Sequence, residues 1–521
     1  EISACLVGSE MCIRDSVYTE QRTEKGVIMC GIAGMFGTPD SNTKVKKMLA
    51  ILGHRGPDAC GIHTEGKLSI GNTLLKITGD MPQPLTGTGS LVLNGEIYNF
   101  RELAAEIGLK TDSDTELLFT LIERKVRKGI KPTNAVFSVL SKVNGDYALA
   151  YACGTELVLA RDPSGVKPLF YFYEKSMVKP GLAFASEKKA LAFTGREVKP
   201  FPQGGIMGFS TENGKIAEKF TEKSLKITQP EKRISAEKEA IIYLKAALEK
   251  AVELRLTPVS GIAFSGGIDS TFLAALAKRI DPYVSLYAVG LPDSHDIAQA
   301  EYAAEAIGMK RNLKTHFLSP EEIEAVVPEV IYATESTDPM KVAIGLPLHI
   351  VAKTAREEGK RVILTGQGAD ELFGGYSRHE GFFEQGVDVL DREIYSDLEN
   401  ISAINLERDD MVAMANSVEL RVPFLDKEVI KTGLAINPEL KVRKKEGAYI
   451  RKYILRTAAE DLLPPKILWK EKKAVQYGTG VQKTLDRLAR DYGFSKKQGG
   501  HIEKYLSQIA SEKGFDFINE R

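Results

Sequence analysis

A cysteine near the start of the chain is the first residue placed to do chemistry. Cys30 lies in MCGIAGMFG, and the segments HRGPDACG, LNGEIYNF, TDSDTE and RDPSGVKPLFY follow it in that order. A thiol becomes a strong nucleophile once a neighbouring base takes its proton. The α-amine of a terminal residue titrates at about 7.7–8.0 and can serve as that base, whereas a peptide nitrogen cannot. Cys30 can therefore act as a nucleophile only if Met29 and everything before it are absent.

Residues 1–29 are expected to be a leader that is non-native or removed. The stretch lacks the basic start, the sustained apolar run and the small-residue cleavage site of a signal peptide. A cleaved propeptide and a disordered arm are the alternatives to an artefact or a misassigned start. We favour Met29 as the initiator, because the small side chain of Cys30 permits an aminopeptidase to remove it.

The first candidate binding site in the second half of the chain is a glycine-rich turn. An apolar strand ends at Phe264, SGGIDS makes the turn, and TFLAALAKRI opens a helix. Paired glycines let the backbone approach a ligand, and the helix N-terminus offers free N–H groups to an anion. The turn lacks the lysine of a Walker A loop, so it favours binding of pyrophosphate, with Asp269 available to Mg²⁺. A tight turn with no ligand is the alternative.

The segment RVILTGQGADELFGGY repeats this pattern. An apolar strand over Val362–Leu364 ends in a loop that carries Asp370 and Glu371. Because the carboxyl ends of parallel strands meet at one edge of a sheet, Asp269 and Asp370 could share a magnesium ion there. Lys452, in RKKEGAYIRK, could stabilise a developing oxyanion or be one more solvated charge.

The elements that must position these residues differ between the two halves. The first half has short apolar runs (GIAGMF, SLVLN, YALAYAC and LAFAS) and one amphipathic helix, ELLFTLIERKVRKG. From Val259 onwards, the order strand, loop, helix, strand predicts a parallel sheet covered by helices. Before it, AEKEAIIYLKAALEKAVELRL predicts a helix, and its apolar face holds Ile241, Leu244, Leu248, Val252 and Leu256.

The domain boundary is predicted in the polar stretch from Thr221 to Ser235. A chain of 521 residues usually contains more than one domain. We expect domains over 30–222 and 236–490, followed by a peripheral helical tail over 491–521.

Composition excludes several classes of protein. Seventy basic residues balance seventy acidic ones, which gives no basic surface for nucleic acid and no polybasic patch for a membrane. No apolar run reaches the roughly 18 residues that a transmembrane helix needs. Five cysteines in so long a chain favour a reducing cytoplasm. We expect Cys60 and Cys153 to be core thiols, and no spacing of His, Cys and carboxylate residues suggests zinc.

The motifs of the second half together resemble the synthetase domain of the glutamine-hydrolysing asparagine synthetase family. SGGIDS, TGQGADELFGGY, NLERDDMVAMANSVELRVPFLD and RKYILR follow the family's order over most of Ala236–Gly480. The first half resembles the glutaminase domain of class II amidotransferases over about Cys30–Phe209. The resemblance implies an α/β fold class: an α+β αββα sandwich of the N-terminal-nucleophile hydrolases, then an α/β ATP pyrophosphatase domain with a parallel sheet.

The resemblance also implies roles for residues of the first half. Cys30 would attack the side-chain amide of glutamine, and Asn94 and the Gly95 N–H would form the oxyanion hole. Asn94-Gly95 is also an ordinary turn dipeptide, and Asp114 could instead cap a helix. The positions implied to bind glutamine are Arg55, Leu74, Glu96 and Asp114.

In the second half, the resemblance assigns ATP, magnesium and catalytic positions. Asp269 and Asp370 would hold Mg²⁺, and Lys452 would stabilise negative charge during amidation. The residues implied to bind ATP are Ser265, Gly266, Gly267, Asp269, Ser270, Val289, Gly290, Thr365 and Gly366.

Leu74 departs from the family pattern. The family usually has an arginine there, which helps to hold the carboxylate of glutamine. Lys76 or Arg55 could compensate, or glutamine could bind weakly.

Gln367 is a second departure. The family usually has a glutamate at this position, which assists formation of the acyl-adenylate and handles the ammonia proton. A neutral amide can orient a substrate but cannot take a proton. We expect the catalytic acid to have shifted, with Glu335 and Glu371 as the candidates to replace it.

The expected function is that of a cytoplasmic enzyme with glutamine, aspartate and ATP as its small-molecule substrates. Glutamine would release ammonia at Cys30, and ATP with Mg²⁺ would convert aspartate to β-aspartyl-AMP, which ammonia converts to asparagine. No nucleic acid or membrane partner is expected, and a homodimer is the assembly considered. The alternatives are an amidotransferase or cyclase with another carboxylate substrate, a nucleotide-binding regulatory protein without turnover, and synthesis from free ammonia only.

Overall fold

The chain forms two compact units. The computed structural model describes residues 28–38, 40–77, 81–174, 181–212, 215–216, 221–292, 294–470 and 479–518. The first unit ends at Leu225 and leaves out Asp162–Val166, which group with the second unit, from Lys226 onwards. The predicted leader lies outside the described residues, apart from Ile28 and Met29 in the first strand.

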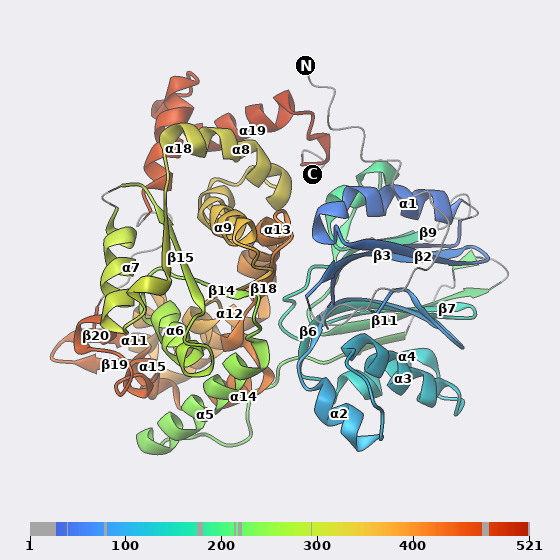
Figure 1. Ribbon diagram of the computed structural model, residues 1–521, viewed down its shortest axis with the longest axis horizontal. Helices are drawn as coiled ribbons and strands as arrows, with labels where there is room; N and C mark the ends of the chain where they lie inside the picture. The colour runs from blue at the N-terminus through green and yellow to red at the C-terminus, as the bar shows by residue number, and fades with distance from the viewer. Residues whose placement is uncertain are drawn as a thin grey trace. The chain divides into compact units, whose positions relative to one another are not determined.

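The first unit contains two antiparallel sheets between layers of helices (Figure 1). One sheet has the strand order β10-β8-β9-β1-β3-β2, and the other has the order β12-β11-β7-β6-β5-β4, with β13 beside β11. Their bounds are β1 Ile28–Phe36, β2 Ala59–Glu65, β3 Leu68–Lys76, β4 Leu85–Thr86, β5 Ser90–Ile97, β6 Gly145–Cys153, β7 Glu156–Arg161, β8 Phe170–Glu174, β9 Gly181–Ala185, β10 Lys199–Pro200, β11 Gly205–Glu212, β12 Lys215–Ile216 and β13 Thr221–Ser224. The α-helices are α1 Ser41–Ile51, α2 Phe100–Glu106, α3 Asp114–Val126 and α4 Pro132–Leu140.

Side-chain alternation along β6 explains this layered packing. Ala148, Ala150 and Ala152 belong to a core that both sheets share, whereas Tyr147 and Leu149 pack in a core with α2, α3 and α4. Successive side chains of a strand point to opposite faces, so the alanines face the other sheet and the larger residues face the helices. The helix α1 packs against β1, β2 and β3 on the first sheet. The predicted αββα sandwich is therefore confirmed.

The second unit is built on a parallel sheet with the strand order β16-β15-β14-β17-β18, as the sequence predicts. Its strands are β14 Ser260–Ala263, β15 Ser285–Gly290, β16 Leu313–Phe317, β17 Val362–Leu364 and β18 Glu419–Arg421, and a hairpin pairs β19 Val442–Lys445 with β20 Ala448–Arg451. The α-helices are α5 Glu237–Arg255, α6 Ile268–Ile280, α7 His295–Ala306, α8 Pro320–Thr334, α9 Pro339–Glu357, α10 Ala369–Phe373, α11 Arg378–Gln385, α12 Val387–Ile401, α13 Glu407–Met414, α14 Lys427–Ala435, α15 Tyr453–Ala458, α16 Pro465–Leu468, α18 Val481–Asp491 and α19 His501–Glu512.

Two groups of helices cover this sheet (Figure 1). The helix α9 packs against β14 and β15 and against α8 and α13, whereas α6 packs against β14 and against α5. On α5, the predicted face is buried at Leu244, Leu248 and Val252, but Ile241 and Leu256 are only half-buried because they lie near its ends. In the tail, α19 packs on α8 and α18. Among the described residues, no helix combines the length and the apolar character needed to cross a membrane.

A buried ion pair fastens α5 to the segment after β18. The guanidinium of Arg255, the last residue of α5, binds the carboxylate of Asp426, and both side chains are buried. Asp426 also caps α14 by accepting the Glu428 N–H at 2.9 Å. Removing one partner of a buried pair leaves the other charge uncompensated.

The Arg255→Ala substitution is therefore expected to lower the free energy of unfolding by about 3–5 kcal/mol. Urea unfolding followed by circular dichroism measures the change. Lys245→Ala is the matched control, because its pair with Asp461 is exposed and should contribute at most about 1 kcal/mol. Equal effects of the two substitutions would show that the buried pair does not stabilise the unit.

Candidate functional site

The strand β1 carries Cys30 into the centre of the first sheet. Cys30 lies opposite Leu74 of β3 in the register, and the next residue, Gly31, donates its N–H to Thr73 Oγ1 at 3.0 Å. A Cβ atom at Gly31 would come within 3.3 Å of Arg55 Cδ, which places Arg55 beside this strand. The thiol of Cys30 is outside the described part of the structure, so its predicted role stays a prediction.

Asn94 is connected to the cysteine-bearing strand through a serine that sequence reasoning missed. Asn94 is fully buried in β5, and its Nδ2 donates to Ser186 Oγ at 3.5 Å. The same hydroxyl accepts the backbone N–H of Ile32 at 2.9 Å, two residues after Cys30. The contact with Asn94 is long, so the amide keeps donor capacity for a developing oxyanion. Ser186 ends the predicted strand LAFAS, and no motif pointed to it.

Gly95 is required where β5 meets β6. It pairs with Tyr147, and a Cβ atom would lie 2.2 Å from the carbonyl oxygen of Asp146 and 2.6 Å from Tyr147 Cα. Any larger residue would force these strands apart. The Asn94-Gly95 pair is therefore part of a strand and not a turn dipeptide.

Asp114 is not the N-cap of α3, which was the alternative to a binding role. Ser113 caps the helix by accepting the Glu116 N–H, and Asp114 is the first helical residue. The Asp114 carboxylate accepts the N–H of Ile97 at 3.0 Å and that of its neighbour Thr115 at 2.6 Å. Asp114 is therefore held at the end of β5, the strand that also carries the buried Glu96.

A buried cluster of charges surrounds Glu187, which the sequence did not single out. Arg55 Nη1 lies 2.8 Å and His54 Nε2 3.0 Å from Glu187 Oε1, and Lys189 Nζ lies 2.6 Å from Oε2. Burial alone would raise the pKa of Glu187, but His54, Lys189 and Arg55 together hold the pKa of this carboxyl well below its usual range. The fully buried guanidinium of Arg55 therefore forms an ion pair with Glu187.

The other first-unit predictions have mixed outcomes. Leu74 is buried in the core between the sheets, and Lys76, the other basic residue considered for glutamine, is exposed at the end of β3. Cys60 is exposed in β2, so its prediction as a core thiol was wrong. It lies near the start of the strand, where the side chains are exposed to solvent. Cys153 is half-buried.

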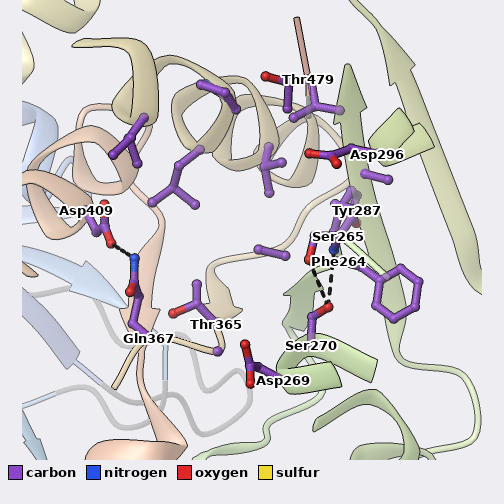
Figure 2. Close-up of a pocket in the computed structure, with 18 of the residues that line it drawn as sticks. Phe264, Ser265, Asp269, Ser270, Tyr287, Asp296, Thr365, Gln367, Asp409 and Thr479 are labelled. Carbon is purple, nitrogen blue, oxygen red and sulfur yellow. Dashed lines mark hydrogen bonds between the residues drawn. The ribbon is translucent and has the colours of Figure 1, made fainter. Parts of the chain in front are cut away.

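In the second unit, the SGGIDS turn forms a hydrogen-bonded loop between β14 and α6. Ser265 and Ser270 hydroxyls lie 3.2 Å apart, and the Ser265 N–H donates to Ser270 Oγ at 3.3 Å (Figure 2). Gly266 has a φ of 69°, and a Cβ atom there would lie 2.5 Å from the carbonyl oxygen of Gln299. Gly267 precedes the first residue of α6. The predicted strand ends one residue early, because Phe264 already belongs to the loop.

Lys452 joins the two predicted metal ligands. Its Nζ lies 2.8 Å from both carboxylate oxygens of Asp269 and 2.7 Å from Asp370 Oδ1, and its side chain is buried. A Cβ atom at Gly375 would lie 2.2 Å from Lys452 Cε and 2.0 Å from Asp370 Oδ1, so only glycine fits there. Gly366 has the same function for the two loops, since its Cβ would lie 2.8 Å from Asp269 Cβ.

The donor set fits a magnesium ion that is shared with a ligand. Magnesium prefers oxygen donors and usually keeps water or phosphate oxygens in its coordination shell. Over the described residues, no group of three or more His, Cys, Asp and Glu side chains could hold a metal ion. Asp269 and Asp370 could therefore supply two ligands but not a closed protein site, and the Lys452 ammonium lies between them in this structure.

A pocket of about 180 Å³ opens at the carboxyl edge of the sheet. The predicted ATP-binding residues that line it are Ser265, Asp269, Ser270, Val289, Thr365 and Gly366. Its apolar wall includes Ile344, Pro347 and Leu348 from α9. Gly266 and Gly267 lie in the loop before α6 and Gly290 ends β15, but these three glycines are not among the described lining residues. Such an edge, with hydroxyls and carboxylates on one side and apolar groups on the other, suits a nucleotide.

The candidates to replace a glutamate at position 367 do not reach this pocket. Glu371 is buried and accepts hydrogen bonds from Tyr376 Oη and from Asn405 Nδ2. Burial, and then the charge of Asp370, raise the pKa of Glu371. Glu335 ends α8 with a left-handed backbone (φ 52°) and is not among the described lining residues.

Gln367 itself lines the pocket, and its amide nitrogen donates to the carboxylate of Asp409 (Figure 2). Asp409 also lines the pocket. Asp409 belongs to the segment NLERDDMVAM, and no role was predicted for it from the sequence. The adjacent acidic residues Asp409 and Asp410 were the feature of that segment that could have indicated a functional residue.

Two family profiles match the chain. One is described as a glutamine amidotransferase domain and matches residues 29–218, and the other is described as asparagine synthase and matches residues 243–384 and 383–510. Together they span both compact units.

Curated relatives match over most of their length. The putative glutamine-hydrolyzing asparagine synthetase 1 of Methanocaldococcus jannaschii is 35% identical, over 92% of this chain and 98% of the relative. Asparagine synthetase B of Escherichia coli is 28% identical, over 87% of this chain and 83% of the relative. Asparagine synthetase 1 of Saccharomyces cerevisiae is 29% identical, over 87% of this chain and 85% of the relative.

The charge cluster at Glu187 predicts a specific dependence of stability on pH. The folded pKa of Glu187 lies below the unfolded value of about 4.3, so its contribution is complete above that pH and is lost as the pH falls towards the folded pKa. Glu187→Gln should cost about 3–5 kcal/mol at neutral pH, and the gap to the wild type should narrow below about pH 4.

Urea unfolding of both proteins across this pH range measures that gap. Glu102→Gln, an exposed change on α2, is the control and should leave stability unchanged. A gap that stays constant down to the acid transition would contradict a depressed pKa.

Proposed function

The chain belongs to the family of glutamine-hydrolysing asparagine synthetases, and we propose that its two units carry the two halves of one reaction. It is an ATP-dependent ligase that makes asparagine from aspartate with nitrogen from glutamine. The first half-reaction releases ammonia from glutamine, and the second uses ATP to activate aspartate. We also propose which residue performs each step.

In the first unit, Cys30 is the nucleophile. With its α-amine free, that amine takes the thiol proton, and the thiolate attacks the side-chain amide carbon of glutamine. The oxygen of the tetrahedral intermediate becomes negative, and Asn94 Nδ2 and the Gly95 N–H donate to it. Collapse releases ammonia, and water then hydrolyses the thioester to glutamate. The buried residues Glu96, in β5, and Asp114, at the end of β5, bind the α-ammonium of glutamine.

In the second unit, aspartate is activated. The β-carboxylate of aspartate attacks the α-phosphorus of ATP, an O–P bond forms, and pyrophosphate leaves. The SGGIDS loop binds the pyrophosphate through its N–H and hydroxyl groups. A magnesium ion held by Asp269 and Asp370 would neutralise charge on the phosphates.

Amidation completes the reaction. Unprotonated ammonia attacks the acyl carbon of β-aspartyl-AMP, AMP leaves, and the nitrogen loses a proton to give asparagine. Lys452 stabilises the negative charge that develops on the acyl oxygen and on the departing phosphate. The ammonia must be kept from water, because ammonium has no lone pair with which to attack.

One observation supports this proposal most directly. Side chains from four separate motifs meet at a single edge of the parallel sheet: Ser265 and Asp269 from the first, Asp370 from the second, Asp409 from the third and Lys452 from the fourth. Such convergence is expected of an adenylate-forming site and not of a chance run of charges.

Cys30→Ala separates the two nitrogen sources. The variant should lose glutamine-dependent synthesis by at least about 10³-fold, because the covalent route is gone. Synthesis with ammonium chloride should stay within about twofold of the wild type. Product analysis by mass spectrometry, with asparagine, AMP and pyrophosphate all quantified, measures both activities. Full glutaminase activity in the variant would refute the nucleophile assignment.

Asp269→Asn should give the reverse pattern. ATP–pyrophosphate exchange in the presence of aspartate should fall by about 10²-fold or more, because a phosphate-facing carboxylate is lost, while glutamine hydrolysis continues. Asp461→Asn removes an equally charged but exposed side chain and should change neither activity. Exchange at the wild-type rate in Asp269→Asn would exclude Asp269 from the adenylation site.

A further inference from the structure

Gln367 and Asp409 form a hydrogen-bonded pair on the wall of the synthetase pocket. The amide nitrogen of Gln367 donates to Asp409 Oδ2, and both residues line the pocket (Figure 2). Gln367 comes from the loop after β17, whereas Asp409 comes from α13. The pair therefore joins two motifs that are 42 residues apart in the sequence.

The partner of Gln367 determines which end of the amide faces the pocket. An ionised carboxylate accepts hydrogen bonds but donates none, so the amide must turn its N–H₂ group towards Asp409. The amide carbonyl oxygen then faces away from Asp409. Within the described chain, no hydrogen bond engages this oxygen. Gln367 therefore offers a hydrogen-bond acceptor to whatever binds in the pocket.

Asp409 is held firmly enough to impose this orientation. Arg408 Nε donates to Asp409 Oδ1 at 2.8 Å, and both side chains are buried. This charge-assisted bond fixes the carboxylate of Asp409 and leaves Oδ2 to accept from Gln367. The turn before α13, Ser402–Leu406, is π-helical, and such a turn inserts a residue and rotates the following side chains by about 100°. Asp409 lies in the first turn of α13, directly after this π-helical turn.

The proposed reaction supplies two substrate groups that need such an acceptor. Ammonia and the α-ammonium group of aspartate both carry N–H bonds. The protonated α-ammonium has no lone pair, and ammonia uses its lone pair to attack the acyl carbon. Neither group can therefore accept a hydrogen bond from an amide N–H₂ group. A flipped Gln367 would present N–H₂ to these groups and repel them. An acceptor at this position binds them.

We propose that Asp409 is a positioning residue that fixes the Gln367 amide, so that its carbonyl oxygen accepts a hydrogen bond from an N–H group of the substrate. The substrate group is the incoming ammonia or the α-ammonium of aspartate. This role rests on the proposed function. It gives the GQGADE loop an acceptor without a glutamate at position 367.

Moving the carboxylate from one partner to the other tests the pair. In Asp409→Asn, the amide of Gln367 loses its fixed orientation, and kcat/KM for the substrate that it contacts should fall about tenfold. The affected substrate is identified from kcat/KM for ammonium chloride and for aspartate, while KM for ATP should stay within about twofold.

In the double variant Gln367→Glu with Asp409→Asn, the amide introduced at position 409 donates to the carboxylate introduced at position 367, which keeps an acceptor in the pocket. This variant should recover to within about threefold of the wild type.

The double variant separates positioning from mere support of the fold. Arg408 loses its carboxylate partner in both variants, so a purely structural role of Asp409 would leave the double variant as impaired as Asp409→Asn. That result, or full activity in Asp409→Asn, would overturn the proposal. Glu399→Gln, an exposed change on α12, is the control for conversion of a carboxylate to an amide.

A measurement without turnover keeps this proposal distinct from the proposed function. In Gln367→Glu alone, two carboxylates lie within hydrogen-bond distance, and like charges make the second ionisation unfavourable. Relative to the wild type, its melting temperature should therefore fall as the pH rises from about 4 to about 8, because raising the folded pKa of a carboxyl removes stability above its unfolded pKa of about 4.3. An unchanged melting temperature would refute the pair. A wild-type protein that makes no asparagine would refute the proposed function instead.

Discussion

One ammonium between two carboxylates organises the second unit. Lys452 reaches Asp269 in the first turn of α6 and Asp370 in the first turn of α10, so three distant segments converge on one nitrogen atom. Two acidic side chains this close would repel each other without a cation. The approach also needs the absence of side chains at Gly366 and Gly375, where even a methyl group would collide. Gly366 and Gly375 therefore let the lysine and the two carboxylates approach closely enough to neutralise one another.

The fold could be predicted from the sequence where a local pattern fixes it. The alternating run YALAYAC became β6, and Val362–Leu364 became β17 with the predicted bounds. Hydrophobic periodicity located α5, although Ile241 and Leu256 are less buried than their phase suggests. Cys60 shows the limit of this approach: the residue type favours burial, but its place at a strand end exposes it.

The contacts that complete the sites could not be predicted in this way. Ser186 joins Ile32 to Asn94 across 154 and 92 residues of sequence, and no residue near it indicates this. Gln367 was recognised as a departure, but its partner Asp409 lies on another element and follows a π-helical turn that no propensity predicts. A substitution in a motif therefore has to be judged with the side chain that it contacts. For Gln367, that neighbour is a carboxylate.

The alanines that line the inner face of β6 have a consequence for the glutaminase chemistry. Ala148, Ala150 and Ala152 are small members of a core between the two sheets that also holds large residues such as Phe36 and Leu159, and Ala148 lies opposite Asn94 in the register. Asn94 belongs to one sheet, while Ile32 and Ser186 belong to the other or border it. Short side chains on β6 therefore leave the Asn94 amide room to contact Ser186 across the core. A larger side chain at Ala148 would crowd this contact, and with it the proposed oxyanion donor, without touching the proposed nucleophile.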